Sequence, residues 1–147
     1  MSLALQAPID SGREKYLKGK HDFIVYTLRK ALVKSYLGKT VTISIDRPVG
    51  SVHPNHDDII YPINYGYIPK VFGGDGEELD VYMLGVDIPV SEFTGKIIGI
   101  VHRHNDVEDK LVMSPEEMSF TAEEIADGVR FQEQYYDSEI ESMEDLK

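Results

Sequence analysis

The fold of this chain is constrained most by a series of short extended segments that end at glycine or proline. Apolar and polar residues alternate over 41–46, and short apolar runs follow at 80–84, 96–102 and 111–113. Segments of this length, separated by glycine and proline turns, are typical of strands with one buried face. Five or six such strands followed by a helix predict a small closed or partly closed β-barrel. Periodicity alone leaves open whether the sheet closes.

One segment rich in tyrosine and proline, IIYPINYGYIP over 59–69, stands out within this pattern. Its tyrosines at positions 61, 65 and 67 alternate with other residues, so an extended chain places them on one face. Its prolines at positions 62 and 69 cannot donate a ladder hydrogen bond. They therefore predict an edge or a bend rather than a central strand.

Two helices flank the predicted strands. Apolar residues recur at helical spacing over 22–36, and Gly38 ends that pattern. Ser119 or Thr121 is the predicted cap of a second helix, which runs from about residue 122 to residue 136. The chain is therefore divided into an irregular segment (1–20), an added helix (21–37), a barrel domain with its C-terminal helix (38–136) and an acidic tail (137–147).

Composition excludes several classes of function. The 147 residues carry a net charge of −11 and contain no cysteine. Disulfides, thiolate metal sites and a cysteine nucleophile are therefore excluded, and a net-acidic domain is a poor candidate for binding nucleic acid. No apolar run reaches the roughly 18 residues of a membrane span. We expect a soluble intracellular chain with neither a nucleic-acid nor a membrane partner.

Two acidic clusters lie at the ends of predicted strands. The first reads DGEELD over 75–80, and the second reads DVEDK over 106–110. If adjacent strands bring both clusters to one rim, their mutual repulsion requires cations, and oxygen ligands suit Mg²⁺, Mn²⁺ or Ca²⁺. Lys110, Arg47 and tyrosine hydroxyls could then hold phosphate oxygens. On spacing alone, ordinary polar hairpin turns are the simpler interpretation.

The tyrosine-rich segment and the first acidic cluster together resemble the soluble family I inorganic pyrophosphatases. In that family an Asp-x-Asp-x-x-Asp run shortly follows Tyr-Pro-x-Asn-Tyr-Gly, and this chain has YPINYG from residue 61 and DGEELD from residue 75. The second cluster resembles the family's second acidic turn, and FQEQYY over 131–136 resembles its C-terminal helix. The resemblance covers roughly residues 38–136 and is closest to a diverged, short member of the bacterial type.

This resemblance implies a mainly β (α+β) fold, a five-stranded OB-like closed barrel with flanking N- and C-terminal helices. It also implies hydrolysis of pyrophosphate to two phosphates in the cytoplasm by a homo-oligomer. The reaction would depend on Mg²⁺, with Mn²⁺ as a possible substitute.

The resemblance also assigns roles residue by residue. The implied metal ligands are Asp75, Glu77, Asp80, Asp106 and Glu108. Glu77 stands where the family has an Asp that assists the attacking water, and Asp109 is the rival of Glu108 if the turn shifts by one residue. The implied phosphate-binding groups are Tyr65, Lys110 and Tyr135, with Lys110 also neutralising the leaving phosphate. Arg47 is added as the nearby candidate for an Arg that the family carries in a loop that is shorter here.

Three departures from the family pattern keep other functions open. Thr42 and Ser44 replace a usual Lys and Glu, and Tyr136 replaces a usual Lys. At least two cations are therefore missing or relocated. One alternative is hydrolysis of another phosphoanhydride, such as a nucleotide or a short polyphosphate. The other is an inactive module that binds phosphate or metal on the same fold.

Overall fold

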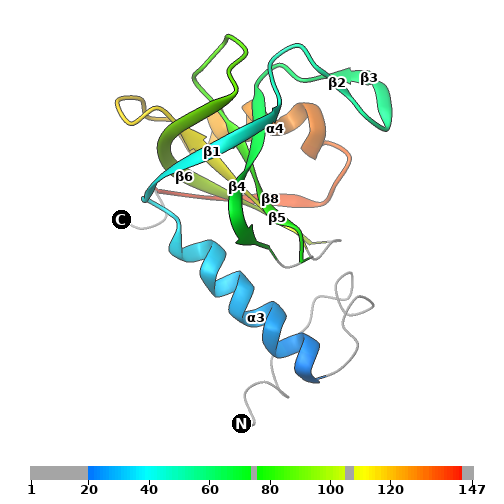
Figure 1. The fold of residues 1–147 in the computed structure, drawn as a ribbon, viewed down its shortest axis with the longest axis vertical. Coiled ribbons are helices and arrows are strands. Elements are labelled where there is room, and N and C mark those ends of the chain that lie inside the picture. Colours follow the sequence, from blue (N-terminus) through cyan, green and yellow to red (C-terminus); the bar gives the residue numbers. More distant parts are fainter. Residues whose placement is uncertain (1–19, 74–75, 105–107, 144–147) are drawn as a thin grey trace.

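A computed structural model shows a closed five-stranded barrel with helices packed against it (Figure 1). The structure describes residues 20–73, 76–104 and 108–143. The strands follow one another around the barrel as β1 (Thr40–Arg47), β4 (Asn64–Phe72), β5 (Glu78–Met83), β7 (Asp109–Ser114) and β6 (Glu92–Arg103), and β6 pairs back with β1. The pairs are antiparallel except β5 with β7, which is parallel. The mainly β class and the closed barrel are therefore confirmed.

The long strand β6 serves two neighbours along one edge. Its first half pairs with β1 and closes the barrel, and its second half pairs with β8 (Ser138–Ser142). The sequence pattern predicted an acidic tail from residue 137, whereas the structure places a strand there. The strand forms because Ile140 packs on the core beneath α4 while the acidic side chains on either side of it remain partly exposed.

The core has two layers. Inside the barrel, alternate side chains of the strands pack together around Ile43, Val81 and Leu111. Outside it, α4 (Ala122–Glu133) covers the opposite face of β5, β6 and β7 through Ile125 and Val129. Thr121 caps α4 as predicted, with a reciprocal pair of hydrogen bonds to Glu124.

The added helix α3 (Lys20–Ser35) projects from one end of the barrel (Figure 1). Only its last turns reach the barrel core, where Val33 is 2% exposed. Lys30 forms an ion pair of 2.6 Å with Asp109 at the start of β7, and Lys34 forms one of 3.3 Å with Glu141 of β8. Among the residues that the structure describes, two ion pairs and a small apolar contact attach this helix to the barrel.

Strand β4 carries the tyrosine-rich segment and lies between β1 and β5, which contradicts its prediction as an edge. The prolines are tolerated because they lie outside the regular ladder. The first precedes β4, and the second lies where the register with β5 breaks, next to Lys70 with φ 64°. Gly66 is required here, because a Cβ atom would lie 1.8 Å from the Ser44 carbonyl oxygen of β1.

A small hairpin, β2 (Val52–His53) and β3 (His56–Ile60), connects β1 to β4. The buried side chain of Asn64 forms hydrogen bonds to the loop before this hairpin and to the loop after β5. Its side-chain oxygen accepts from the Val49 amide at 3.1 Å, and its nitrogen donates to the Ile88 carbonyl at 3.0 Å. The asparagine of the YPINYG run thus has a structural role, holding two loops against the barrel.

Candidate active site

The Lys110 ammonium group is the centre of the candidate site. It lies on the outer face of the barrel and is 3% exposed. Its Nζ atom donates to the Tyr65 hydroxyl at 2.6 Å and to the Asp80 carboxylate at 2.9 Å. It also contacts the Glu108 carboxylate. We call these four residues the Lys110 cluster.

Strand register explains why these residues meet. Val81 of β5 pairs in parallel with Leu111 of β7, so the residues before them, Asp80 and Lys110, lie side by side. Tyr65 of β4 pairs with Tyr82 of β5, two residues along from Asp80 and therefore on the same face. Side chains distant in sequence thus converge because β4, β5 and β7 are adjacent.

Electrostatics favours charged Lys110 and neutral Tyr65 at pH 7. Burial would lower the pKa of Lys110, but the carboxylates of Asp80 and Glu108 raise it above its usual range. Burial, together with the same two carboxylates, raises the pKa of the Tyr65 hydroxyl well above its usual range. The cluster therefore offers a fixed positive charge and a hydroxyl that keeps its proton.

The structure separates Glu108 from its rival Asp109. Because side chains alternate along β7, Glu108 shares the face of Lys110, whereas Asp109 points the other way. Asp109 is 3% exposed, and its carboxylate contacts Lys30 of α3 and His102. Burial would raise the pKa of Asp109, but His102 and Lys30 lower it. Asp109 therefore serves the attachment of α3, and Glu108 faces the cluster.

A chain of buried hydrogen bonds leads from Arg47 towards α4. Arg47 donates to the Tyr61 hydroxyl at 3.2 Å, and that hydroxyl donates to the Gln132 amide oxygen at 2.9 Å. The Gln132 amide nitrogen donates to the Tyr82 hydroxyl at 2.9 Å, and Tyr82 donates to Glu133 at 2.5 Å. These hydrogen bonds hold Arg47, one of the predicted phosphate-binding groups, next to Tyr61.

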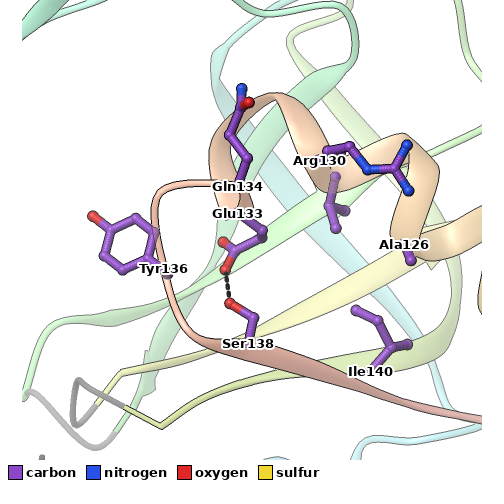
Figure 2. Close-up of a pocket in the computed structure, with 8 residues that line it drawn as sticks. Ala126, Arg130, Glu133, Gln134, Tyr136, Ser138 and Ile140 are labelled. Carbon is purple, nitrogen blue, oxygen red and sulfur yellow. Dashed lines mark hydrogen bonds between the residues drawn. The ribbon is translucent and has the colours of Figure 1, made fainter.

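A second buried cation, Arg103 of β6, was missed by the sequence reasoning. It is 3% exposed, and its Nη2 atom lies 2.6 Å from the Glu133 carboxylate. Its guanidinium also lies 3.6 Å from the centre of the Tyr136 ring and 3.7 Å from a Glu108 oxygen. Ser138 completes the arrangement by donating to Glu133 at 2.6 Å (Figure 2). A cation therefore packs against Tyr136, at the position where the family carries a Lys.

Asp46 is a further carboxylate that the sequence reasoning missed. The register of β1 with β4 shifts between Ile45 and Arg47, so Asp46 is the extra residue of a β-bulge. Such bulges re-aim side chains. Partial burial of its carboxyl group and the charge of Asp80 raise the pKa of Asp46, while Arg47 opposes the rise. Asp46 therefore lies within electrostatic reach of the Lys110 cluster, two residues beyond the Ser44 that replaces a Glu.

The other residues predicted for the site lie outside the Lys110 cluster or outside the residues that the structure describes. Asp75 and Asp106 fall outside the residues that the structure describes. Glu77 precedes β5 and has an exposed side chain. Tyr135 follows α4, is 59% exposed and lines a cavity against the β2–β3 hairpin. The structure thus brings together Tyr65, Asp80, Glu108 and Lys110, with Arg47 nearby.

Comparison with known proteins identifies the family of the chain. A family model described as inorganic pyrophosphatase matches residues 36–144. The chain belongs to the inorganic pyrophosphatase family. That match includes every strand of the barrel, α4 and β8, and it leaves out the whole of α3.

The chain is also similar, at low identity, to pyrophosphatases of known sequence or structure. Soluble inorganic pyrophosphatase 2 of Chlamydomonas reinhardtii is 30% identical over 95 residues, which cover 57% of this chain and 50% of that protein. The chain thus spans about half the length of this curated relative. The pyrophosphatase structure from Ehrlichia chaffeensis aligns with a TM-score of 0.57 at 17% identity, covering 74% of this chain and 88% of that one. The Helicobacter pylori structure gives 0.52 at 16% identity, covering 72% and 86%. The two structures support the fold.

Two carboxylates of the Lys110 cluster are candidate ligands for a divalent cation. Asp80 and Glu108 each place a carboxylate oxygen against the Lys110 ammonium group, and hard oxygen ligands are those that Mg²⁺ prefers. Within residues 20–73, 76–104 and 108–143, no three His, Asp or Glu side chains gather closely enough to hold a metal ion. The same ranges contain no helix long and apolar enough to cross a membrane.

Proposed function

We propose that this chain hydrolyses inorganic pyrophosphate to two phosphates with the help of Mg²⁺. The observation that carries the proposal is the convergence of Tyr65, Asp80 and Glu108 on the Lys110 ammonium group. Tyr65, Asp80 and Lys110 lie on β4, β5 and β7, and Glu108 directly precedes β7. A buried cation flanked by carboxylates suits a substrate that is itself a polyanion bound with divalent cations.

Lys110 and Tyr65 are assigned to the phosphate groups. The ammonium has three donors, and in the structure it contacts three oxygen acceptors. A phosphate oxygen that enters the cluster takes the place of one of them. The positive charge then lies where negative charge grows on the leaving phosphate, and burial strengthens this interaction. Tyr65 keeps its proton because its pKa is raised, so it can donate to a second phosphate oxygen.

The carboxylates are assigned to the cation and the attacking water. We assign cation binding to Asp75, Asp80, Asp106 and Glu108, with Glu77 as a further ligand or as the base that accepts the proton of the water. When bound, Mg²⁺, or Mn²⁺ in its place, neutralises pyrophosphate and activates the water. Arg47 and Tyr135 are proposed to hold the outer phosphate. A cytoplasmic location and self-association into a homo-oligomer complete the proposal, and both follow from the family resemblance.

The test is phosphate release from pyrophosphate by the purified protein with Mg²⁺ or Mn²⁺. We expect release that stops when a chelator is added and that is lost in Asp80→Ala, because that change removes a carboxylate from the cluster. Circular dichroism checks that the variant is folded. Release by Asp80→Ala at the wild-type rate would contradict the site assignment. No release by the wild type with either metal would contradict the proposed function.

Asp46 provides a second test of the cation assignment. Asp46→Asn keeps the size of the side chain and removes a charge near Asp80. We expect the Mg²⁺ concentration for half-maximal activity to rise by about tenfold, since each 1.4 kcal/mol of lost interaction is tenfold. Asp87→Asn removes an exposed charge elsewhere and should leave this concentration unchanged. Equal responses of the two variants would mean that Asp46 acts only through net charge.

A further inference from the structure

A cavity of about 290 Å³ lies between the β2–β3 hairpin and the end of α4, on the same side of the molecule as Arg47. The family match assigns it no role, and the proposed reaction uses one residue of its lining, Tyr135. Its volume is close to the lower limit of about 300 Å³ for small-molecule pockets. It is therefore large enough for one small organic group.

The lining of the cavity offers rings and neutral or acidic groups. Residues that line it include His53, Asn55, His56, Asp58, Ile59 and Tyr135, and none of its described lining residues is Lys or Arg. Burial, with His56 and Arg47 nearby, lowers the pKa of His53, which favours the neutral imidazole at pH 7. Phosphate would find no permanent cation here, and it would meet the Asp58 carboxylate. The lining suits a flat, uncharged group that stacks and donates hydrogen bonds.

The cavity adjoins the phosphate-binding groups through one tyrosine. The His53 ring lies nearly parallel to the Tyr61 ring, at 6.0 Å between centroids, and Tyr61 contacts Tyr65 of the Lys110 cluster at 5.5 Å. The Tyr61 hydroxyl also joins Arg47 to Gln132, which lines the cavity. A diphosphate held on Lys110 and Arg47 would therefore have one end on the side of Tyr61 that faces the cavity lining.

We propose that this cavity binds the base of a nucleoside diphosphate, whose two phosphates occupy the positions of pyrophosphate. Such a substrate is pyrophosphate with a nucleoside ester on one end. Bases stack on aromatic rings, and the amino group of adenine, guanine or cytosine donates to an acceptor such as the Asp58 carboxylate.

The proposal rests on the proposed function, because it uses the same cation-assisted hydrolysis. The oxygen of water forms a bond to the terminal phosphorus, and the bond from that phosphorus to the bridging oxygen breaks. The bridging oxygen leaves with the electron pair on a nucleoside monophosphate. One proton of the water passes to a base of the site.

The test compares ligands with and without a base. The bound probe is α,β-methylene-ADP, whose bridge resists hydrolysis, and methylenediphosphonate is its counterpart without the nucleoside. Titration calorimetry with Mg²⁺ gives both dissociation constants, and phosphate release from ADP and pyrophosphate gives both activities. We expect wild-type protein to bind α,β-methylene-ADP and to release phosphate from ADP.

Two neighbouring aspartates of β3 provide matched variants. Asp58→Ala and Asp57→Ala each remove one exposed charge from the same strand, but only Asp58 lines the cavity. We expect Asp58→Ala to weaken binding of α,β-methylene-ADP about tenfold, whereas Asp57→Ala should not. Both variants should keep the wild-type rate on pyrophosphate and the wild-type affinity for methylenediphosphonate.

The outcomes separate this proposal from the proposed function. Pyrophosphate hydrolysis without hydrolysis or binding of the nucleotide probes would overturn the base site and leave the proposed function standing. An equal effect of the two aspartate variants on α,β-methylene-ADP would also overturn it. Probe binding that Asp58→Ala weakens, in a protein that hydrolyses neither compound, would support the base site and contradict the proposed function.

Discussion

Replacing Lys110 with Met is expected to lower kcat/KM for pyrophosphate about 10²–10³-fold, the range measured for losing one preorganised donor at a developing negative charge. Met fills the space of the lysine stem but carries neither charge nor donor. Because Lys110 is 3% exposed and contacts two carboxylates, its loss also leaves these acceptors less well satisfied. We expect the free energy of unfolding to fall by about 1–3 kcal/mol. Phosphate release and urea unfolding measure the two effects separately.

Cation binding distinguishes the catalytic role of Lys110 from a structural one. The ammonium occupies carboxylate oxygens that we assign to Mg²⁺, so its removal should not weaken binding of the ion. The shift in melting temperature with Mg²⁺ or Mn²⁺ should therefore remain in Lys110→Met. Lys39→Met serves as a control at an exposed lysine and should match the wild type. Wild-type turnover by Lys110→Met would contradict the proposed role, and loss of the Mg²⁺ shift would indicate a disrupted site.

Much of the Lys110 cluster could be predicted because local patterns encode it. The two motifs place Asp80 and Lys110 at the starts of apolar segments, and apolar segments form the strands. The sequence also indicates that Glu108, rather than Asp109, faces the cluster, since residues 108 and 110 lie on one face of an extended chain. An alternation argument extended by two residues would have separated these two carboxylates.

Features that depend on long-range pairing could not be predicted in this way. The bulge that presents Asp46 arises from the register of β1 with β4, and no local pattern fixes it. Arg103 meets Glu133 across 30 residues, only after α4 packs on β6. Strand β8 has a single large apolar residue, Ile140. Its acidic composition therefore predicted an exposed tail, and one apolar residue was too little to indicate a strand. In each case a tertiary partner supplies the missing information.

The buried ion pair of Arg103 and Glu133 leads to the largest expected effect on stability. Arg103 is 3% exposed and Glu133 is 6% exposed. Arg103→Met leaves the Glu133 carboxylate buried without its cation, and breaking such a pair typically costs about 3–5 kcal/mol. Arg130→Met is the matched control, because Arg130 pairs with Asp127 on the exposed face of α4. A surface pair contributes about 0–1 kcal/mol, so urea unfolding should show little change in the control.

A double variant tests whether the cost arises from the pair itself. Glu133→Gln removes the charge but keeps an acceptor for Tyr82 and Ser138. We expect Arg103→Met with Glu133→Gln to lose at least about 1 kcal/mol less stability than the sum of the single changes. Additive losses would mean that Arg103 acts through its contact with the Tyr136 ring instead.

The pH dependence of stability gives an independent test of whether the Arg103–Glu133 pair stabilises the protein. Burial would raise the pKa of Glu133, but Arg103, with help from Ser138 and Tyr82, holds it below its usual range. The pair therefore stabilises the wild type above the usual carboxyl pKa, and this contribution is lost as the pH falls through the lowered value. Without Arg103, burial is opposed only by the hydrogen bonds from Ser138 and Tyr82, and the pKa of Glu133 rises. The stability difference between wild type and Arg103→Met should consequently shrink from about pH 7.5 to about pH 5, as protonation neutralises the buried carboxylate. A difference that stays constant over this range would show that Glu133 does not remain buried once Arg103 is removed.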